Sequence, residues 1–200
     1  MIYFIGKYII GPFILLFWRP RVIGKNRLRV KGPAIFIANH ISMADPLLIA
    51  LLSPRVVHFM AKKEIFKNPI GRWFFRSLFA FPINRKTADL ASLRNAMEVL
   101  RKGKVFGIFP EGKRSITYEL DELEHGAAFL ALRSGAPLVP IYIHPSSYHT
   151  CRPKVYIGEP LVPAAIVKGV SRPDQAGVLT AAMEAALLDN RDKLEAALCR

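Results

Sequence analysis

Residues 34–52 read AIFIANHISMADPLLIALL, and this stretch decides how the rest of the chain is organised. The first five residues, 34–38, are all apolar and lie between a glycine-proline pair and an asparagine, which predicts a short strand buried on both faces. Pro46 predicts the start of a helix, with Asp45 as its N-cap and leucines following at helical spacing. A strand, a polar turn and a helix thus follow one another, which places His40 at a strand end and Asp45 at a helix start.

His40 and Asp45 are candidates for a catalytic pair, because reacting groups in open α/β sheets gather beyond the carboxyl ends of the strands. The turn between them is short enough to bring the imidazole and the carboxylate together. If Asp45 accepts a hydrogen bond from one ring nitrogen, it fixes the tautomer and leaves the other nitrogen able to remove a proton. The alternative is that Asp45 is only a helix cap and His40 only a turn residue.

A second apolar strand breaks into a charged turn at residues 105–115, which read VFGIFPEGKRS. This turn contains a proline and a glycine and carries the side chains of Glu111, Lys113 and Arg114. Two strands of the chain therefore end in polar or charged turns.

Together these two turns resemble the glycerolipid acyltransferase family, whose members acylate glycerol 3-phosphate or lysophosphatidic acid. His40 and Asp45 match the family's H-x4-D motif, and residues 109–115 match its F-P-E-G-x-R-S block. Two weaker blocks follow in the family's order, an arginine-bearing segment at 81–85 and a late V-P segment at 138–141. Four blocks in order are far more specific than any one of them.

The resemblance implies an enzyme of phospholipid biosynthesis that transfers an acyl group from a thioester to the free hydroxyl of lysophosphatidic acid, giving phosphatidic acid. It implies that His40 is the general base and that Asp45 orients it. It also implies a set of residues that bind the acceptor: Arg85, Glu111, Gly112, Lys113 and Arg114. Lys113 departs from the family pattern, where threonine is frequent, and adds positive charge. For Arg85 and Lys113 the alternative is plain exposure to solvent.

The residues favour direct transfer without a covalent enzyme intermediate. There is no G-x-S-x-G nucleophile elbow, and neither Cys151 nor Cys199 lies in a candidate motif, so the acceptor hydroxyl is the expected nucleophile. Backbone amides of residues 110–112 are candidates for stabilising the oxyanion. Three alternatives stay open: another lysolipid or glycerol 3-phosphate as acceptor, a lipid hydrolase that activates water, and a noncatalytic lipid-binding module.

The expected acyl donor is acyl-CoA or acyl-carrier protein, and no bound cofactor is expected. We also expect no metal site, because the histidines and the cysteine of residues 144–151 lack the close ligand pairs typical of one. Two cysteines in 200 residues are too few for a disulfide framework, so a reducing compartment is expected.

The composition indicates a basic protein that meets an anionic and apolar partner, since the net charge is +14 and 52% of residues are hydrophobic. A membrane phospholipid surface fits both features. Nucleic acid fits only the charge, and the sequence has no zinc-finger spacing and no aromatic RNA-binding signature, so no nucleic-acid partner is expected.

Residues 1–18, MIYFIGKYIIGPFILLFW, are apolar but are interrupted by Lys7 and by a glycine-proline pair. They are at the short limit for a spanning helix, and they lack the basic start and the cleavage site of a secretory signal. Six basic residues follow in 19–31, and no acidic residue precedes Asp45. We expect 1–18 to be a membrane-anchoring helix that lies in the interface at the cytoplasmic face of the cell membrane, monotopic or peripheral.

Residues 19–200 are expected to form one α/β acyltransferase domain with a mixed central sheet flanked by helices. Beyond the segments above, apolar runs and turn residues predict the remaining elements. The predicted strands are 56–60, 81–84, 138–143 and an edge strand at 155–157, and the predicted helices are 61–79, 87–102, 123–134 and 173–198, the last with a break near 189–190.

Overall fold

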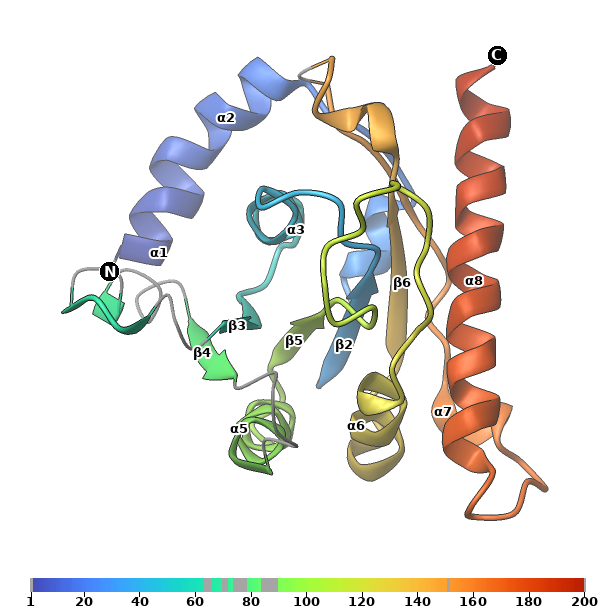
Figure 1. The fold of residues 1–200 in the computed structure, drawn as a ribbon. Coiled ribbons are helices and arrows are strands. Elements are labelled where there is room, and N and C mark those ends of the chain that lie inside the picture. Colours follow the sequence, from blue (N-terminus) through green and yellow to red (C-terminus); the bar gives the residue numbers. More distant parts are fainter. Residues whose placement is uncertain are drawn as a thin grey trace.

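The computed structural model describes residues 2–62, 66–69, 72–73, 79–83, 90–150 and 152–199. Within them a seven-stranded sheet has the order β1-β7-β6-β2-β5-β3-β4 (Figure 1). The strands are β1 Arg21–Ile23, β2 Ala34–Ala38, β3 Val57–Lys62, β4 Ala80–Ile83, β5 Val105–Ile108, β6 Leu138–Ile143 and β7 Lys154–Ile157. The helices are α1 Ile2–Ile5, α2 Gly11–Trp18, α3 Asp45–Leu52, α5 Leu90–Arg101, α6 Gly126–Ser134, α7 Pro163–Ile166 and α8 Gln175–Leu198. Shorter turns of helix are η1 Gly6–Ile10, η2 Lys25–Leu28 and η4 Pro145–Ser147.

The sheet is mixed, as the sequence predicts. Strands β6, β2, β5, β3 and β4 run parallel to one another, β7 is antiparallel to β6, and β1 pairs in parallel with β7. Because β2 and β5 are parallel neighbours, the turns that follow them lie at the same edge of the sheet. This edge holds both motifs.

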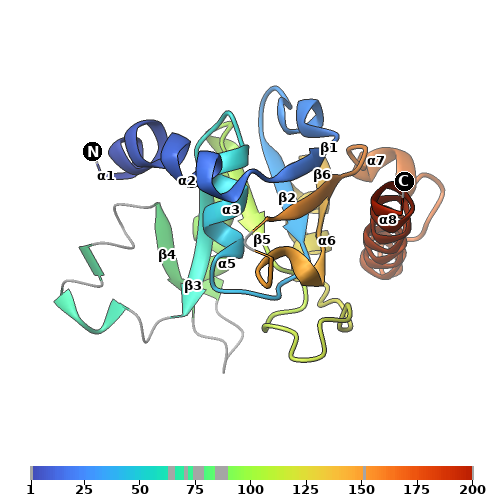
Figure 2. The same cartoon turned by 90° about the horizontal axis from the view of Figure 1, so that it is seen from above.

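Both faces of the sheet are covered, and β2 contributes to both cores. Phe36 faces a core formed with α3, and Ile35 and Ile37 face a second core formed with α5, α6 and α8. Figures 1 and 2 show α5, α6 and α8 on one side of the sheet and α3 with the N-terminal helices on the other. All five residues of β2 are apolar and all are buried, so this strand is buried on both faces, as its sequence predicts.

Several element boundaries differ from the sequence prediction. The predicted helix at 123–134 begins at Gly126, and the predicted helix at 61–79 starts inside β3, with much of its remainder outside the described residues. The prediction of β7 as an edge strand is wrong, because β1 pairs along its outer side. Only three residues form β1, and they lie in a basic stretch with too little alternation to indicate a strand.

Helix α8 is continuous, so the predicted break near 189–190 is wrong. Asn190 is buried in the middle of this helix, where its side-chain amide donates a hydrogen bond to the carbonyl oxygen of Pro140 at 3.0 Å. A polar residue that suggests a helix break in sequence is here a fixed contact between α8 and β6.

The first 17 described residues, α1, η1 and α2, form a helical segment that packs across α3. At its start the ring of Tyr3 lies edge-on to Phe79, with centroids 5.2 Å apart. In its middle, Gly11 is buried and close to Leu51 of α3, where a Cβ atom would collide with the leucine side chain. Gly11, which breaks the apolar run in sequence, thus allows the close approach of two helices. Among the described residues, no helix combines the length and the apolar character needed to cross a bilayer.

Candidate active site

The imidazole of His40 and the carboxylate of Asp45 form a buried pair beyond the end of β2. Nδ1 of His40 lies 2.8 Å from Oδ2 of Asp45, and the two residues are 8% and 0% exposed. Because a carboxylate only accepts hydrogen bonds, Nδ1 carries the proton. Nε2 then has a free lone pair and is the atom able to act as a base.

Asp45 does not cap α3, and the prediction that it does is wrong. Ala44 occupies the N-cap position, and no side chain caps the helix there. Instead Oδ2 of Asp45 accepts hydrogen bonds from the backbone N–H of Ile41 at 2.8 Å and of Ser42 at 2.7 Å. The carboxylate points back over the loop before the helix, so one oxygen atom fixes both the loop and the imidazole of His40.

The other oxygen of this carboxylate is held by Tyr148, which the sequence analysis did not identify. The hydroxyl of Tyr148 donates to Oδ1 of Asp45 at 2.6 Å. Burial, followed by the charge of Asp45 and this hydrogen bond, raises the pKa of Tyr148 above its ordinary value. The hydroxyl therefore stays protonated and acts as a donor.

Asn39 joins the end of β2 to the end of β6. Its side-chain amide donates to the carbonyl oxygen of Ile143 at 2.9 Å, and its side-chain oxygen accepts from the N–H of Ile143 at 2.8 Å. These two hydrogen bonds continue the pairing of β2 with β6 through a side chain, directly before His40. They therefore fix the backbone from which the imidazole projects.

The second motif packs directly against His40. The ring of Phe109 stacks on the imidazole, with centroids 4.1 Å apart and an angle of 20° between the planes. The N–H of Ser115 donates to the carbonyl oxygen of His40 at 2.8 Å. The structure therefore brings together two segments that the sequence separates by about 70 residues.

Glu111 connects the two turns through its buried carboxylate. Oε1 accepts from the N–H of His40 at 2.7 Å, and Oε2 accepts from the N–H of Asp121 at 3.1 Å. Burial raises the pKa of Glu111 to about 6, although both of these hydrogen bonds act to lower it. In this conformation the carboxylate joins the backbone at His40 to the backbone at Asp121.

Gly112 is required by the geometry of the turn. Its φ angle is +67°, and a Cβ atom there would collide with the carboxylate of Glu124. Its N–H donates to the carbonyl oxygen of Phe109 at 3.1 Å, so this predicted oxyanion donor already has a partner within the turn. Pro110 has no N–H, which leaves the N–H of Glu111 as the remaining candidate in 110–112.

The basic residues of the motif lie at the surface beside the pair. Lys113 is exposed, with Nζ 3.5 Å from Oδ2 of Asp121, and Arg114 is exposed as well. Arg85 lies outside the described residues, so its predicted role as a phosphate ligand stays a prediction.

Comparison with known proteins decides the family. A family model described as Acyltransferase matches residues 19–144. A 1-acyl-sn-glycerol-3-phosphate acyltransferase of Bacillus subtilis is 30% identical over 181 residues, which cover 88% of this chain and 89% of the relative. The chain belongs to the acyltransferase family. The resemblance seen in the two turns is thereby confirmed.

Further similarities of this acyltransferase agree. A 1-acyl-sn-glycerol-3-phosphate acyltransferase of Streptococcus pneumoniae is 32% identical over 141 residues, covering 67% of this chain and 52% of that relative. The crystal structure of a 1-acyl-sn-glycerophosphate acyltransferase from Thermotoga maritima superposes with a TM-score of 0.71 at 25% identity, over 96% of this chain and 80% of that one.

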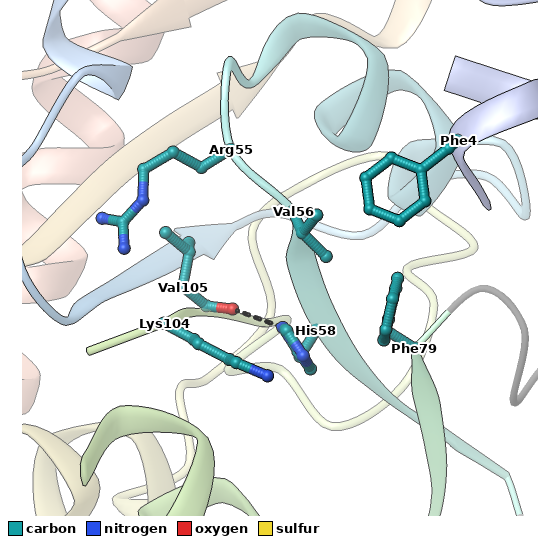
Figure 3. Close-up of a pocket in the computed structure, with 7 residues that line it drawn as sticks. All are labelled: Phe4, Arg55, Val56, His58, Phe79, Lys104 and Val105. Carbon is teal, nitrogen blue, oxygen red and sulfur yellow. Dashed lines mark hydrogen bonds between the residues drawn. The ribbon is translucent and has the colours of Figure 1, made fainter. Parts of the chain in front are cut away.

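A pocket of about 400 Å³ opens at the edge of the sheet opposite to the catalytic pair of the acyltransferase. It lies at the amino ends of β3 and β5. Figure 3 shows the side chain of Lys104 extending toward the ring of His58, with the rings of Phe4 and Phe79 on the other side. Nδ1 of His58 contacts the carbonyl oxygen of Val105 at 3.3 Å. Burial, with the nearby charge of Lys104, lowers the pKa of His58, so this histidine is neutral near pH 7.

Arg55 in this pocket has a structural role. Its guanidinium donates to the backbone carbonyl oxygens of Val30, Gly32 and Gly103, which tie three loops together at the amino edge of the sheet. The parallel strands separate this edge from His40, so the pocket is not part of the catalytic site.

In the described part of the chain, no three His, Cys, Asp or Glu side chains are placed to share a metal ion. Nδ1 of His144 instead contacts the hydroxyl of Ser146 at 2.9 Å and accepts from its backbone N–H at 3.1 Å. Cys151 lies outside the described residues.

Proposed function

We propose that this acyltransferase transfers an acyl group from an acyl thioester to the free hydroxyl of lysophosphatidic acid and forms phosphatidic acid. The observation that carries the proposal is the buried pair of His40 and Asp45, in which Nδ1 is engaged by the carboxylate and Nε2 is left for the acceptor. The relatives named 1-acyl-sn-glycerol-3-phosphate acyltransferase, in Bacillus subtilis and Streptococcus pneumoniae, support this choice of acceptor.

In the proposed reaction, Nε2 of His40 removes the proton of the acceptor hydroxyl while its oxygen attacks the thioester carbonyl. The tetrahedral intermediate collapses, the carbon–sulfur bond breaks, and the thiolate leaves with the proton from the imidazolium. Asp45 stabilises the imidazolium while it exists. A general base in position contributes about 10²- to 10⁴-fold to the rate, and orientation of the two substrates contributes further.

The acceptor phosphate is proposed to bind at the charged turn beside His40. Lys113 and Arg114 are exposed there, so both can meet a ligand that arrives from solvent or from a membrane surface. A guanidinium binds a phosphate through two parallel hydrogen bonds, which orients the lipid as well as attracting it. Arg85 is proposed as a third cation for this phosphate.

The membrane contact is proposed to be the outer face of the N-terminal helical segment, residues 2–18. One face of the segment packs on α3, and the opposite face is apolar and exposed, with Phe13, Leu16 and Phe17 at 71%, 67% and 76%. Soluble proteins rarely expose so many large apolar side chains in one stretch. An interfacial position at the cytoplasmic face lets these side chains enter the acyl region while the basic residues of 19–31 meet anionic headgroups.

The test is an acceptor-dependent assay on the purified protein with lipid vesicles. Acyl-CoA or acyl-carrier protein is supplied with lysophosphatidic acid, with glycerol 3-phosphate, with lysophosphatidylcholine or with no acceptor, and the lipid products are identified by mass spectrometry. Phosphatidic acid formed only when lysophosphatidic acid is present supports the proposal. Free fatty acid without any acceptor identifies a hydrolase, and no turnover of either thioester with any acceptor identifies a noncatalytic lipid-binding protein.

A further inference from the structure

Tyr148 reaches the catalytic pair from a distant part of the chain. It follows η4, the turn of 3-10 helix after β6, and its hydroxyl donates to Oδ1 of Asp45 at 2.6 Å. The other carboxylate oxygen, Oδ2, is already shared by three nitrogen donors: Nδ1 of His40 and the N–H groups of Ile41 and Ser42. Asp45 is completely buried, so these four donors determine the orientation of its carboxylate.

Tyr148 in turn rests on the N-terminal helices. The ring of Trp18, the last residue of α2, meets the ring of Tyr148 edge-to-face, with centroids 6.3 Å apart at 77°. Such an aromatic contact adds to the burial of both rings and restricts their orientation.

Backbone contacts join the end of α2 to the segment that carries Tyr148. The chain reverses at Arg19, whose φ angle is 42°, and the N–H of Arg21 then donates to the carbonyl oxygen of Pro153 at 2.8 Å. The side chain of Arg152 donates to the carbonyl oxygen of Arg19 at 3.4 Å. The position of α2 and the positions of residues 152 and 153, which follow Tyr148 closely in the chain, are therefore linked.

We propose that Tyr148 is a positioning residue for the base, that Trp18 holds Tyr148 in place, and that the seating of α2 thereby sets the geometry of His40 and Asp45. The proposal rests on the proposed function, in which His40 is the base. A contact network of three side chains, from Trp18 through Tyr148 to Asp45, connects the apolar helical segment to the catalytic centre.

The physical effect of the hydroxyl is twofold. It fixes the carboxylate plane, because it binds Oδ1 while Oδ2 is held by the loop. It also withdraws negative charge from the side of Asp45 that faces away from His40, which limits how strongly the carboxylate favours the imidazolium. In the part of the chain that the structure describes, the carboxylates that contact His40 are those of Asp45, at the imidazole, and Glu111, at the backbone N–H.

The first experiment compares Tyr148→Phe with Tyr142→Phe. Tyr142 is a buried tyrosine of β6 whose neighbouring charges, from Glu195 and Arg191, belong to α8 on the opposite face of the sheet, so it is a matched control. In Tyr148→Phe, kcat should fall about 10-fold, as expected for the loss of one charge-assisted hydrogen bond, while the KM for lysophosphatidic acid stays within twofold. The acidic limb of the kcat/KM profile should move to higher pH, because the carboxylate then favours the imidazolium more strongly.

A purely structural tyrosine would change the melting temperature without moving this pH profile. A kcat within twofold of the unchanged protein, or an acidic limb at the same pH, overturns the positioning role. His40→Ala is measured in parallel. If His40→Ala stays active, the proposed base is wrong; if it is inactive and Tyr148→Phe is fully active, only the positioning role is wrong.

The second experiment tests the link to α2 with Trp18→Leu, alone and combined with Tyr148→Phe. Trp18→Leu should lower kcat about threefold when Tyr148 is present and should have no further effect on kcat in the Tyr148→Phe background. Sedimentation with anionic vesicles measures membrane binding of each variant, so activity is compared at equal bound protein. Independent, multiplying effects of the two substitutions overturn the proposed network.

Discussion

Replacement of Asp45 by asparagine tests how one buried carboxylate serves both the fold and the reaction. Asparagine has nearly the same shape, and its side-chain oxygen can take the place of Oδ2 while its NH2 group faces the hydroxyl of Tyr148. Nδ1 of His40 and the N–H groups of Ile41 and Ser42 then still find an acceptor. The substitution therefore removes the charge and keeps most of the hydrogen bonds.

The expected loss of stability follows from those three bonds. A hydrogen bond to a charged group contributes about 1.5–3 kcal/mol, and a neutral one about 0.5–1.5 kcal/mol. A difference of about 1 kcal/mol for each of the three donors gives a destabilisation of roughly 3 kcal/mol. Asp45→Ala should cost more, because it leaves the two backbone N–H groups and Nδ1 without an acceptor in a site with no exposure.

The expected loss of activity follows from the imidazolium. Unit charges about 4 Å apart attract by about 4 kcal/mol at an effective dielectric constant of 20, which corresponds to roughly 10³-fold in rate. Since the orientation of the ring is largely kept, we expect kcat of Asp45→Asn to fall between ~10²- and ~10³-fold.

The assay is phosphatidic acid formation in vesicles, combined with thermal unfolding of the same preparations. Asp45→Ala should be at least as inactive as Asp45→Asn and should have a clearly lower melting temperature. Turnover of Asp45→Asn within tenfold of the unchanged protein would refute the reasoning, because the charge of Asp45 would then have no part in catalysis.

Three further predictions concern the second motif and the N-terminal helices. Because burial raises the pKa of Glu111 to about 6, the stability that the protonated carboxyl contributes is present below about pH 4.5 and is lost as the pH rises through 6. In urea unfolding, the difference in free energy of unfolding between the unchanged protein and Glu111→Gln should therefore shrink as the pH rises from about 4.5 to above 6. Arg114→Ala should raise the KM for lysophosphatidic acid, and Arg114→Lys should restore it only in part because an ammonium lacks the planar fork; an unaltered KM in both would exclude Arg114 as a phosphate ligand. Replacing Phe13, Leu16 and Phe17 together with serine should release the protein from vesicles without lowering its melting temperature, since these side chains are mostly exposed; retained vesicle binding would place the membrane contact elsewhere.

Sequence patterns predicted the fold well where the signal was local. The apolar run of β2, the leucines of α3 and the long helix α8 each carry their periodicity within a few residues, and each was predicted. The errors arose where tertiary contacts override a local signal. Asn190 does not end α8, because its amide is used against β6, and β7 gains a neighbour from a basic segment at the start of the chain.

The carboxylate of Asp45 has both kinds of contact, one set with residues close in sequence and one with a distant residue. Its Oδ2 atom is bound by donors from residues 40–42, and this local set is what the H-x4-D spacing encodes. Its Oδ1 atom is bound by Tyr148, a partner 103 positions away, and Asn39 is bound by Ile143 at a separation of 104. A tyrosine in a loop has no local pattern that marks it as a partner of a distant carboxylate, so only the topology, which sets β6 beside β2, brings it there. The H-x4-D motif thus specifies His40 and the hydrogen bonds to Oδ2 of Asp45. The order of the strands brings Tyr148 to Oδ1 of the same carboxylate.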